Sequence, residues 1–324
     1  SMSSEIYPKR TLSIKTVTFT KALSFFLAII YGSFIVISLQ LQFFLGSGDI
    51  NSYIHFFDEA GNDASVVTIR GDYAFRIAVF WLTEFFDITT ISVLSYMAFA
   101  ISSVIFYLYS INIRSQKYLI YILPLFLMVF FTPNVQVLFS SGIRSGIAFA
   151  ILMLGFVSFK GLNRYILFFL ASAVHLSMLP IISLYFLFNF LNNKRIKTPF
   201  IFSIITLLVG SFVIAIGSTR VHFVDVVSAS IAYNLIIFYV ALLIIFINKK
   251  ALKDVYGFMS VGLILIYLMG LTIDASFIRY VGNAIILYLF FLIKRGEVGT
   301  IQTFSFGYSP FFILTLYYSI ANWF

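Results

Sequence analysis

The chain has 324 residues, of which 61% are hydrophobic, 19% are aromatic and only 10% are charged, and its mean hydropathy is +1.03. Soluble globular domains are about 45–50% apolar and about 25% charged, so this composition excludes a soluble enzyme and predicts a polytopic membrane protein. The formal net charge is +9, which in such a protein must first be compared with the charge bias of the loops. The sequence contains no cysteine, which excludes disulfides, thiolate nucleophiles and cysteine-ligated metals.

Runs of about 20 apolar residues predict membrane spans. They cover residues 22–45, 90–111, 118–135, 142–159, 199–217, 228–247, 256–273, 276–293 and 304–322. Two further apolar segments are ambiguous, because 73–88 contains Arg76 and Glu84, and because 164–192 is too long for one span. Their assignment depends on the side of the membrane that each loop faces.

The loops can be assigned from their lysine and arginine residues. Basic residues cluster at 9–21, 114–117, 160–164, 194–197, 249–253 and 294–295, and these clusters include every lysine. Because lysine and arginine favour cytoplasmic loops, all six clusters and the N-terminus are expected on the cytoplasmic side.

This sidedness determines the two ambiguous segments. Residues 73–88 then cannot cross the membrane, and they either lie at the outer interface or re-enter; we expect an interfacial helix on the outer side. Residues 164–192 must enter and return as two short helices that turn near His175, with Pro180 opening the second. The predicted fold is all-α, with about eleven membrane-embedded helices and the interfacial helix.

The predicted organisation is a single transmembrane domain over residues 1–324. Residues 46–88 are expected to form an outer loop that ends in the interfacial helix. Residues 218–227 are expected to form a second outer loop. Both loops would then face the same compartment, opposite to the lysine-rich loops.

The five basic residues outside the six clusters are all arginines. Arg70, Arg76, Arg144, Arg220 and Arg279 fall on the expected outer side, with nine of the twelve acidic residues and all three histidines. Arginine presents a planar fork that recognises phosphate through two hydrogen bonds, which lysine cannot do. The sequence shows no glycine-rich phosphate loop, paired-carboxylate metal motif or ATP-binding domain. We therefore expect no cofactor and no metal, and energy from the substrate or from a gradient.

Arg144 is the strongest candidate for an anion site. It lies in the first turn of the predicted span 142–159, where the helix dipole disfavours a cation. The free N–H groups of a helix N-terminus together with an arginine favour anion binding, whereas the alternative is an interfacial arginine that snorkels. Arg279 has the same placement, with Asp274 as a salt-bridge partner. Arg220 follows a predicted span and serves equally well as a helix cap.

The candidates for proton transfer come from the first outer loop and the hairpin. His175 is the best single proton acceptor, since the pKa range of histidine suits general-base catalysis near neutrality. A hydrogen-bonded structural histidine is the equal alternative. Asp49 follows the first span and also fits as the end of that helix. Asp72 also fits as the cap of the next helix and as an i, i+4 partner of Arg76.

These features occur in a recognisable order. An acidic, tyrosine-containing outer loop precedes an arginine that opens a span in residues 141–148 (SGIRSGIA), and residues 173–178 (AVHLSM) follow. This order resembles the EpsG/Wzy family of bacterial O-antigen and exopolysaccharide polymerases, and residues 141–190 carry the best match. Similar proteins have an acid-x-Gly-Phe/Tyr pattern after the first outer loop, whereas residues 70–73 (RGDY) place the acid after the glycine.

The resemblance implies chain extension on the outer face of the bacterial cytoplasmic membrane. The substrate would be oligosaccharide linked to undecaprenyl diphosphate, without metal, nucleotide or nucleic acid, and the partners would be membrane lipid and a chain-length regulator protein. Arg144 and Arg279, assisted by Arg220, would hold the diphosphate leaving group. Removing such electrostatic stabilisation typically lowers the rate on the order of 100- to 1000-fold.

Further residues are needed to remove the proton from the acceptor hydroxyl and to bind the glycan. His175, Asp49 or Asp72 would remove the proton from the sugar hydroxyl, and a single displacement predicts inversion at the anomeric carbon. The glycan needs a polar outer cavity with aromatic residues, for which Tyr53, Arg70 and Arg76 are the candidates in the first outer loop.

Three other functions use similar features. A ligase that moves finished glycan would use the same diphosphate site, so the residues do not separate it from a polymerase. A transporter or flippase of lipid-linked sugars is disfavoured because the sequence shows no midplane basic pathway and no pair of corresponding broken helices. A membrane acyltransferase needs histidine chemistry on the cytoplasmic side, whereas all three histidines are expected outside.

Overall fold

The computed structural model describes residues 14–44, 50, 53–54, 57, 73–113, 116–140, 142–194, 238–244, 249–270 and 279–321. Within these ranges all regular secondary structure is helical. The predicted all-α class is therefore confirmed for the described part of the chain, and its apolar helices are those of a membrane-embedded protein.

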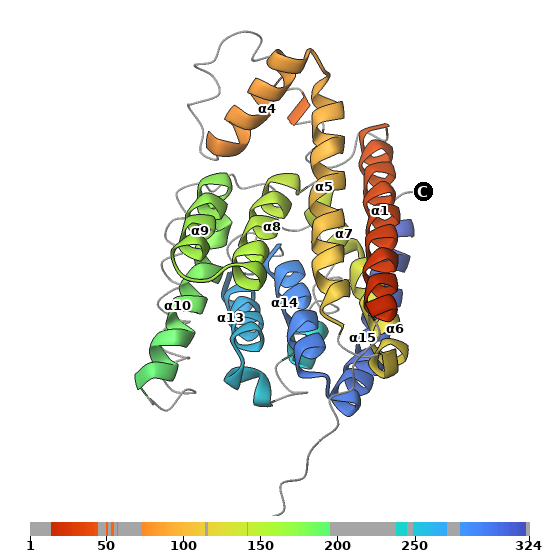
Figure 1. Ribbon diagram of the computed structural model, residues 1–324, viewed down its shortest axis with the longest axis vertical. Coiled ribbons are helices and arrows are strands. Elements are labelled where there is room, and N and C mark those ends of the chain that lie inside the picture. Colours follow the sequence, from red (N-terminus) through yellow and green to blue (C-terminus); the bar gives the residue numbers. More distant parts are fainter. Residues whose placement is uncertain are drawn as a thin grey trace, which may run out of the picture.

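Figure 1 shows the helices in chain order. They are α1 (Ile14–Phe44), α4 (Tyr73–Phe86), α5 (Thr90–Ile111), α6 (Gln116–Phe130), α7 (Pro133–Phe139), α8 (Ile143–Ser158), α9 (Leu162–Val174), the 3-10 turn η1 (Leu176–Met178), α10 (Leu179–Lys194), the 3-10 turn η3 (Lys249–Lys253), α13 (Val255–Gly270), α14 (Arg279–Arg295) and α15 (Val298–Ala321). The predicted spans 199–217 and 228–247 lie mostly outside the described residues, as does the predicted outer loop 218–227.

Helix length limits how many of these elements cross a bilayer alone. Among the described residues, Lys21–Phe44 and Thr90–Ile111 are long and apolar enough to span, and the bent pair α6 and α7 adds a third if it counts as one span. The shorter apolar helices include α8, of 16 residues, and α9, of 13 residues. At 1.5 Å per residue they reach about 24 and 20 Å, which is less than the roughly 30 Å hydrocarbon core. The number of eleven embedded helices stays a prediction.

The predicted span 118–135 is broken in the structure. α6 ends at Phe130 and α7 begins at Pro133, with a bend of 61° between them. Proline has no N–H and disfavours helical backbone in the residue before it, and Thr132 is accordingly extended, with φ −69° and ψ 131°. The Gln136 side chain donates to the exposed Phe131 carbonyl at 2.9 Å, so the polar backbone at the break is bonded inside the protein.

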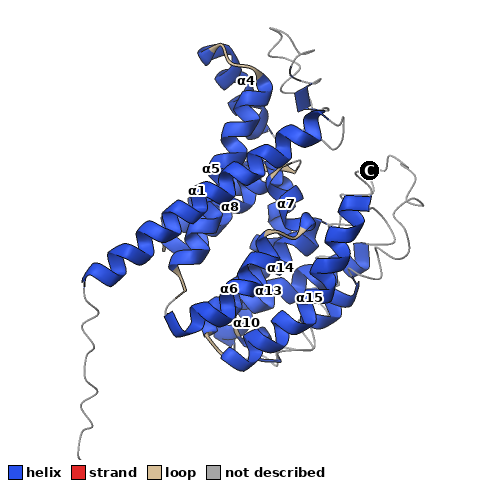
Figure 2. Ribbon diagram, turned by 90° about the vertical axis from the view of Figure 1, so that its right-hand side faces the viewer, coloured by secondary structure: helices blue, strands red, loops and turns tan. Residues whose placement is uncertain are grey.

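The helices pack in two groups joined by α7. α5 packs against α1 on one side and α8 on the other, while α13 packs between α10 and α14, and α15 lies on α6. Figure 2 shows α1, α5 and α8 side by side and the C-terminal helices beside them. Buried tyrosine hydroxyls connect the groups, since Tyr109 donates to the Ile286 carbonyl and Tyr31 to the Phe130 carbonyl, both at 2.9 Å.

The predicted hairpin 164–192 corresponds to α9, η1 and α10, and the preceding helix α8 forms a further hairpin with α9. α9 ends at Val174, the chain breaks at His175 and η1, and α10 carries Pro180 in its first turn. The turn between α8 and α9 uses Gly161 at φ +59°, a backbone conformation that favours glycine. Figure 1 shows that the turn lies at one end of this pair and the break at the other.

Arg164 links the helices α8, α9 and α10. Its Nε and Nη2 donate to the Phe159 carbonyl at 3.1 and 2.8 Å, and its Nε also lies 3.1 Å from the Gly155 carbonyl. Its Nη1 donates to the Tyr185 hydroxyl of α10 at 2.7 Å. The cation therefore satisfies carbonyls at the C-terminal end of α8, where the helix dipole favours it.

We predict that Arg164→Ala destabilises the protein. The variant loses charged-group hydrogen bonds to two carbonyls and to Tyr185, an effect of about 2 kcal/mol. Thermal unfolding in detergent should show a lowered Tm. Lys160→Ala removes an exposed cation from the same turn and should melt like the parent protein. Equal melting of the two variants would contradict the structural role of Arg164.

Candidate functional site

The antiparallel pair α8 and α9 brings Arg144 and His175 to the same end. Arg144 lies in the first turn of α8, and His175 is the residue directly after α9. α8 also contacts η1, which begins at Leu176. Thirty residues of sequence separate the two side chains, and the short hairpin returns the chain to the level at which it started (Figure 1).

The Arg144 guanidinium is held by a tyrosine of the first outer loop. Its Nε donates to the Tyr53 hydroxyl at 2.8 Å, and its Cζ lies 4.9 Å from the centre of the Tyr53 ring. Tyr53 is only 8% exposed, whereas Arg144 is half-buried, so the contact is partly shielded from solvent. This hydrogen bond uses Nε. The two terminal nitrogens, Nη1 and Nη2, are the pair that can donate together to one phosphate.

Aromatic contacts fix Tyr53 against α4. Its ring lies 5.8 Å from that of Phe75, and Phe57 lies 6.4 Å from Phe75 on the same helix. α4 also packs against α5 and α9. The predicted interfacial helix therefore lies over the end of the bundle that carries Arg144 and His175, as Figure 1 shows.

Glycines at the N-terminus of α8 allow this helix to lie close to α7. Gly142 donates its N–H to the Val137 carbonyl at 2.7 Å, and a Cβ at Gly146 would overlap the Leu138 carbonyl. Bulkier residues at these two positions would separate α8 from α7. No acidic residue and no side-chain cap occupies the first turn of α8, so the helix dipole is positive beside the guanidinium.

His175 forms the break between α9 and η1. Its N–H donates to the Ala171 carbonyl at 3.0 Å, and its own carbonyl accepts from Met178 at 3.1 Å. The backbone is extended, with φ −157° and ψ 120°. The side chain is half-buried, and its Nε2 is shielded from solvent. The imidazole thus lies at the end of a helix with one of its two nitrogens buried.

Arg279 begins α14, as the sequence predicts for a residue early in the span from 276, and of this residue the structure describes the backbone. One turn later, Gly282 faces the Asn134 carbonyl, with 3.1 Å between that oxygen and the position of a Cβ. α14 therefore meets the beginning of α7, and α8 meets its end. α7 has seven residues, about 10 Å, so a short helix connects the starts of α8 and α14.

The other predicted site residues divide into described and undescribed ones. Arg76 lies in α4 next to Phe75, half-buried, with its Nη1 shielded from solvent. Asp49, Arg70, Asp72 and Arg220 lie outside the described residues. The structure thus gathers Tyr53, Arg144 and His175 at one end, with Arg76 on the helix above them.

Two contacts of the site were not predicted. Tyr53 was a candidate for glycan binding, whereas the structure shows it bonded to Arg144, 91 residues away in sequence. The Gln42 amide at the end of α1 donates to the Ser140 hydroxyl at 3.3 Å, just before α8. No spacing in the sequence signals either contact, because both join distant segments. Among the described residues, no group of three histidine, aspartate or glutamate side chains is placed to hold a metal ion.

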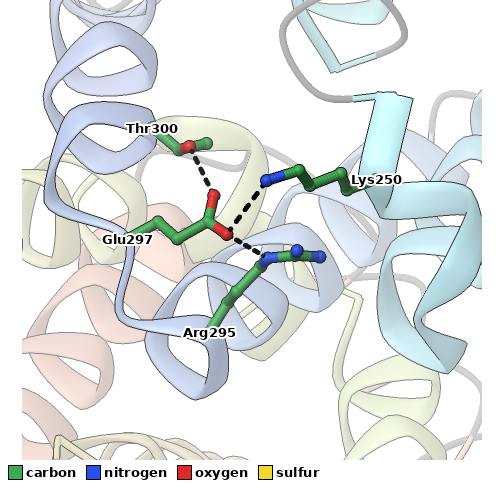
Figure 3. A network of polar contacts seen from close by, with 4 residues as sticks. All are labelled: Lys250, Arg295, Glu297 and Thr300. Carbon is green, nitrogen blue, oxygen red and sulfur yellow. Dashed lines mark hydrogen bonds and ion pairs between the residues drawn. The ribbon is translucent and has the colours of Figure 1, made fainter.

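A separate polar cluster lies at the turn between α14 and α15 (Figure 3). Glu297 accepts from Arg295 at 2.7 Å and from Thr300 at 3.2 Å, and Lys250 lies 3.5 Å away. The hydrogen bond from Arg295 holds the pKa of Glu297 below its usual value. Figure 1 shows this turn at the opposite end of the bundle from α4. The cluster ties α15 to η3 and is distinct from the Arg144 site.

The composition and the helices define a membrane-embedded, all-helical protein. Comparisons of the chain with protein-family models, with curated proteins and with solved structures find no match.

We predict an energetic coupling between Arg144 and Tyr53. Tyr53→Phe removes the hydroxyl acceptor and Arg144→Ala removes the donor, so their effects on unfolding should be non-additive by about 1 kcal/mol. The measurement is a double-mutant cycle on stability in detergent. Tyr96→Phe, which changes a 69% exposed tyrosine, should add independently to Arg144→Ala. Additive effects of Tyr53→Phe and Arg144→Ala would contradict the contact.

Proposed function

We propose that this chain is a membrane glycosyltransferase that polymerises oligosaccharide repeats linked to undecaprenyl diphosphate. The observation that carries the proposal is the placement of Arg144 in an uncapped first turn, held by Tyr53, at the same end of the hairpin as His175. An arginine at the positive end of a helix suits a dianionic leaving group. The resemblance to EpsG/Wzy polymerases supplies the substrate class.

The proposal includes a topology. About eleven helices are embedded in the bacterial cytoplasmic membrane, with the N-terminus and the lysine-rich loops in the cytoplasm. The end of the bundle that carries α4, Arg144 and His175 faces outward, and α4 lies at the outer interface. The positive-inside bias supports this arrangement, since the turn with Lys250 and Arg295 lies opposite to α4.

The proposed reaction is a single displacement. The hydroxyl oxygen of the incoming lipid-linked repeat attacks the anomeric carbon of the growing chain, and the bond between that carbon and the diphosphate oxygen breaks. The electron pair remains on the diphosphate, whose charge Arg144, Arg279 and Arg220 stabilise. The hydroxyl proton passes to His175, or to Asp49 or Asp72. The anomeric carbon is inverted, and Tyr53, Arg70 and Arg76 line the path of the glycan.

A glycan ligase is the second candidate. It would use the same diphosphate site and the same leaving group, and it differs only in the acceptor. The phenotype of a deletion separates the two functions, because loss of a polymerase leaves surfaces with single repeats and loss of a ligase leaves none. A flippase of lipid-linked sugars would instead move its substrate without forming a glycosidic bond.

Purified protein in detergent should convert its lipid-linked repeat into a ladder of longer products without ATP or an ion gradient. Arg144→Lys keeps the charge and loses the fork, and should lower elongation on the order of 100- to 1000-fold. Arg295→Lys, at the opposite end of the bundle, should elongate normally. No ladder together with gradient-dependent movement of the lipid favours the flippase, and normal elongation by Arg144→Lys removes Arg144 from the mechanism.

The cysteine-free chain allows a direct test of sidedness. We expect Asp87→Cys, at an exposed position directly after α4, to react with a membrane-impermeant maleimide in intact spheroplasts. Lys253→Cys, exposed in η3, should react only after permeabilisation. The reverse pattern would place the Arg144 site in the cytoplasm, where the polymerisation reaction proposed above does not occur.

A further inference from the structure

A groove opens between the helices α1 and α5, and neither Arg144 nor His175 is among its lining residues. Its volume is about 560 Å³, within the range of small-molecule sites. At its closed end the helices touch, because a Cβ at Gly32 would overlap the Ser103 hydroxyl and lie 2.9 Å from the Phe99 ring. From this contact the groove runs toward Phe44 on α1 and Thr90 on α5.

The groove combines apolar walls with neutral hydrogen-bonding groups. Ser33 and Gln40 line it from α1, Ser92 and Ser95 from α5, and both Ser33 and Gln40 are exposed. Polar side chains on the lipid-facing surface of a spanning helix are unfavourable unless they are bonded. The lining residues that the structure describes include no charged side chain. The groove therefore fits a ligand with hydrogen-bond acceptors and apolar chains.

Ser95 is the clearest sign of a missing partner. The residue is 8% exposed, and its hydroxyl is shielded from solvent and has no hydrogen-bond partner among the described residues. A serine in a helix can instead donate to the carbonyl four residues earlier. Ser102 does so in the same helix, at 2.6 Å from the Ala98 carbonyl. Ser95 lines the groove with its hydroxyl buried and unbonded, which is costly in an apolar environment.

The length of the groove fits a lipid chain better than a protein helix. Between Ser33 and Gln40, and between Ile91 and Phe99, the lining covers about 10 to 12 Å at 1.5 Å per residue. A spanning helix would need a seam of roughly 30 Å, whereas the chain of a lipid in one leaflet needs about half of that. The Gly32 contact closes the groove at the point where the second half would begin.

We propose that this groove binds one ester-linked glycerolipid of the leaflet that surrounds Phe44. Its ester carbonyls accept hydrogen bonds from the exposed Gln40 amide and from the Ser92 hydroxyl, which also bonds the Thr89 hydroxyl at 2.8 Å. Its acyl chains lie against the apolar walls toward Gly32. An isoprenoid chain offers no acceptor to these groups, and a diphosphate headgroup finds no cation here. The inference depends neither on the proposed activity nor on the orientation of the chain.

The test compares two lipids that differ only in the linkage. The full-length protein is purified in detergent, exchanged with diester or diether phosphatidylcholine and analysed by native mass spectrometry for retained lipid. We expect the diester lipid to be retained about fivefold or more over the diether lipid, since each hydrogen bond lost lowers affinity by about that factor. Gln40→Leu should lower the preference, because it removes one of the two donors, and Ser95→Leu should fill the groove and lower retention of both lipids.

Matched substitutions elsewhere provide the controls. Gln302→Leu on α15 and Ser183→Leu on α10 change exposed positions outside the groove and should retain the diester lipid like the parent protein. Gln40 is exposed, so Gln40→Leu keeps the test informative even if Ser95→Leu fails to fold. Equal retention of diester and diether lipid, or unchanged preference in Gln40→Leu, would overturn the proposal.

Two further outcomes would also overturn it by identifying another occupant. Undecaprenyl diphosphate that displaces the diester lipid from the parent protein, but not from Ser95→Leu, would assign the groove to an isoprenoid chain. Disulfide-linked dimers of Ser33→Cys in membranes would assign it to a helix from a second copy. The absence of native cysteine makes the second measurement specific.

Discussion

The break in the helical path at Thr132 and Pro133 is the constraint on which the candidate site depends. A straight helix through these residues would carry the chain across the bilayer, whereas the 61° bend turns α7 so that α8 begins beside its far end. The break is stable because its polar groups are bonded internally. Thr132 donates to the Met128 carbonyl and bonds Tyr308, at 2.7 and 2.8 Å. Irregular backbone within a membrane bundle requires such partners.

Local sequence patterns predicted some helices of the described residues and missed one break. The span 90–111 agrees with α5 because a run of apolar residues is a local signal, whereas the break near His175 was predicted from the sidedness of the loops. The break at Pro133 was missed because apolar residues continue on both sides of it, and hydropathy does not register the lost N–H. The predicted number of spans came from assigning each loop to one side of the membrane by its basic residues. The lengths of the single helices in the structure do not test that assignment.

For the candidate site, the sequence identified residue types and the structure supplied their neighbours. Arg144 and His175 were singled out from their places at predicted helix ends, and the hairpin brings those ends together. The partner of Arg144 was assigned a different role, because Tyr53 lies in a loop whose path no periodic pattern describes. Contacts between segments 91 residues apart depend on packing, and packing is not visible in one sequence.

Arg144 occupies an electrostatically unfavourable position in α8. A cation in the first turn of a helix is opposed by the dipole, typically by a few tenths to 1 kcal/mol. The hydrogen bond to Tyr53 and the nearby ring offset this cost, but a neutral donor at the same place would bond the hydroxyl without incurring it. Arg164 also lies in a first turn, that of α9, but its side chain reaches the carbonyls at the C-terminal end of α8, where the dipole of α8 favours a cation. The two ends of α8 thus meet two different arginines, Arg164 of α9 at the favourable end and its own Arg144 at the unfavourable one. The anion that the proposed function requires at this helix end would offset the cost of the unfavourable position.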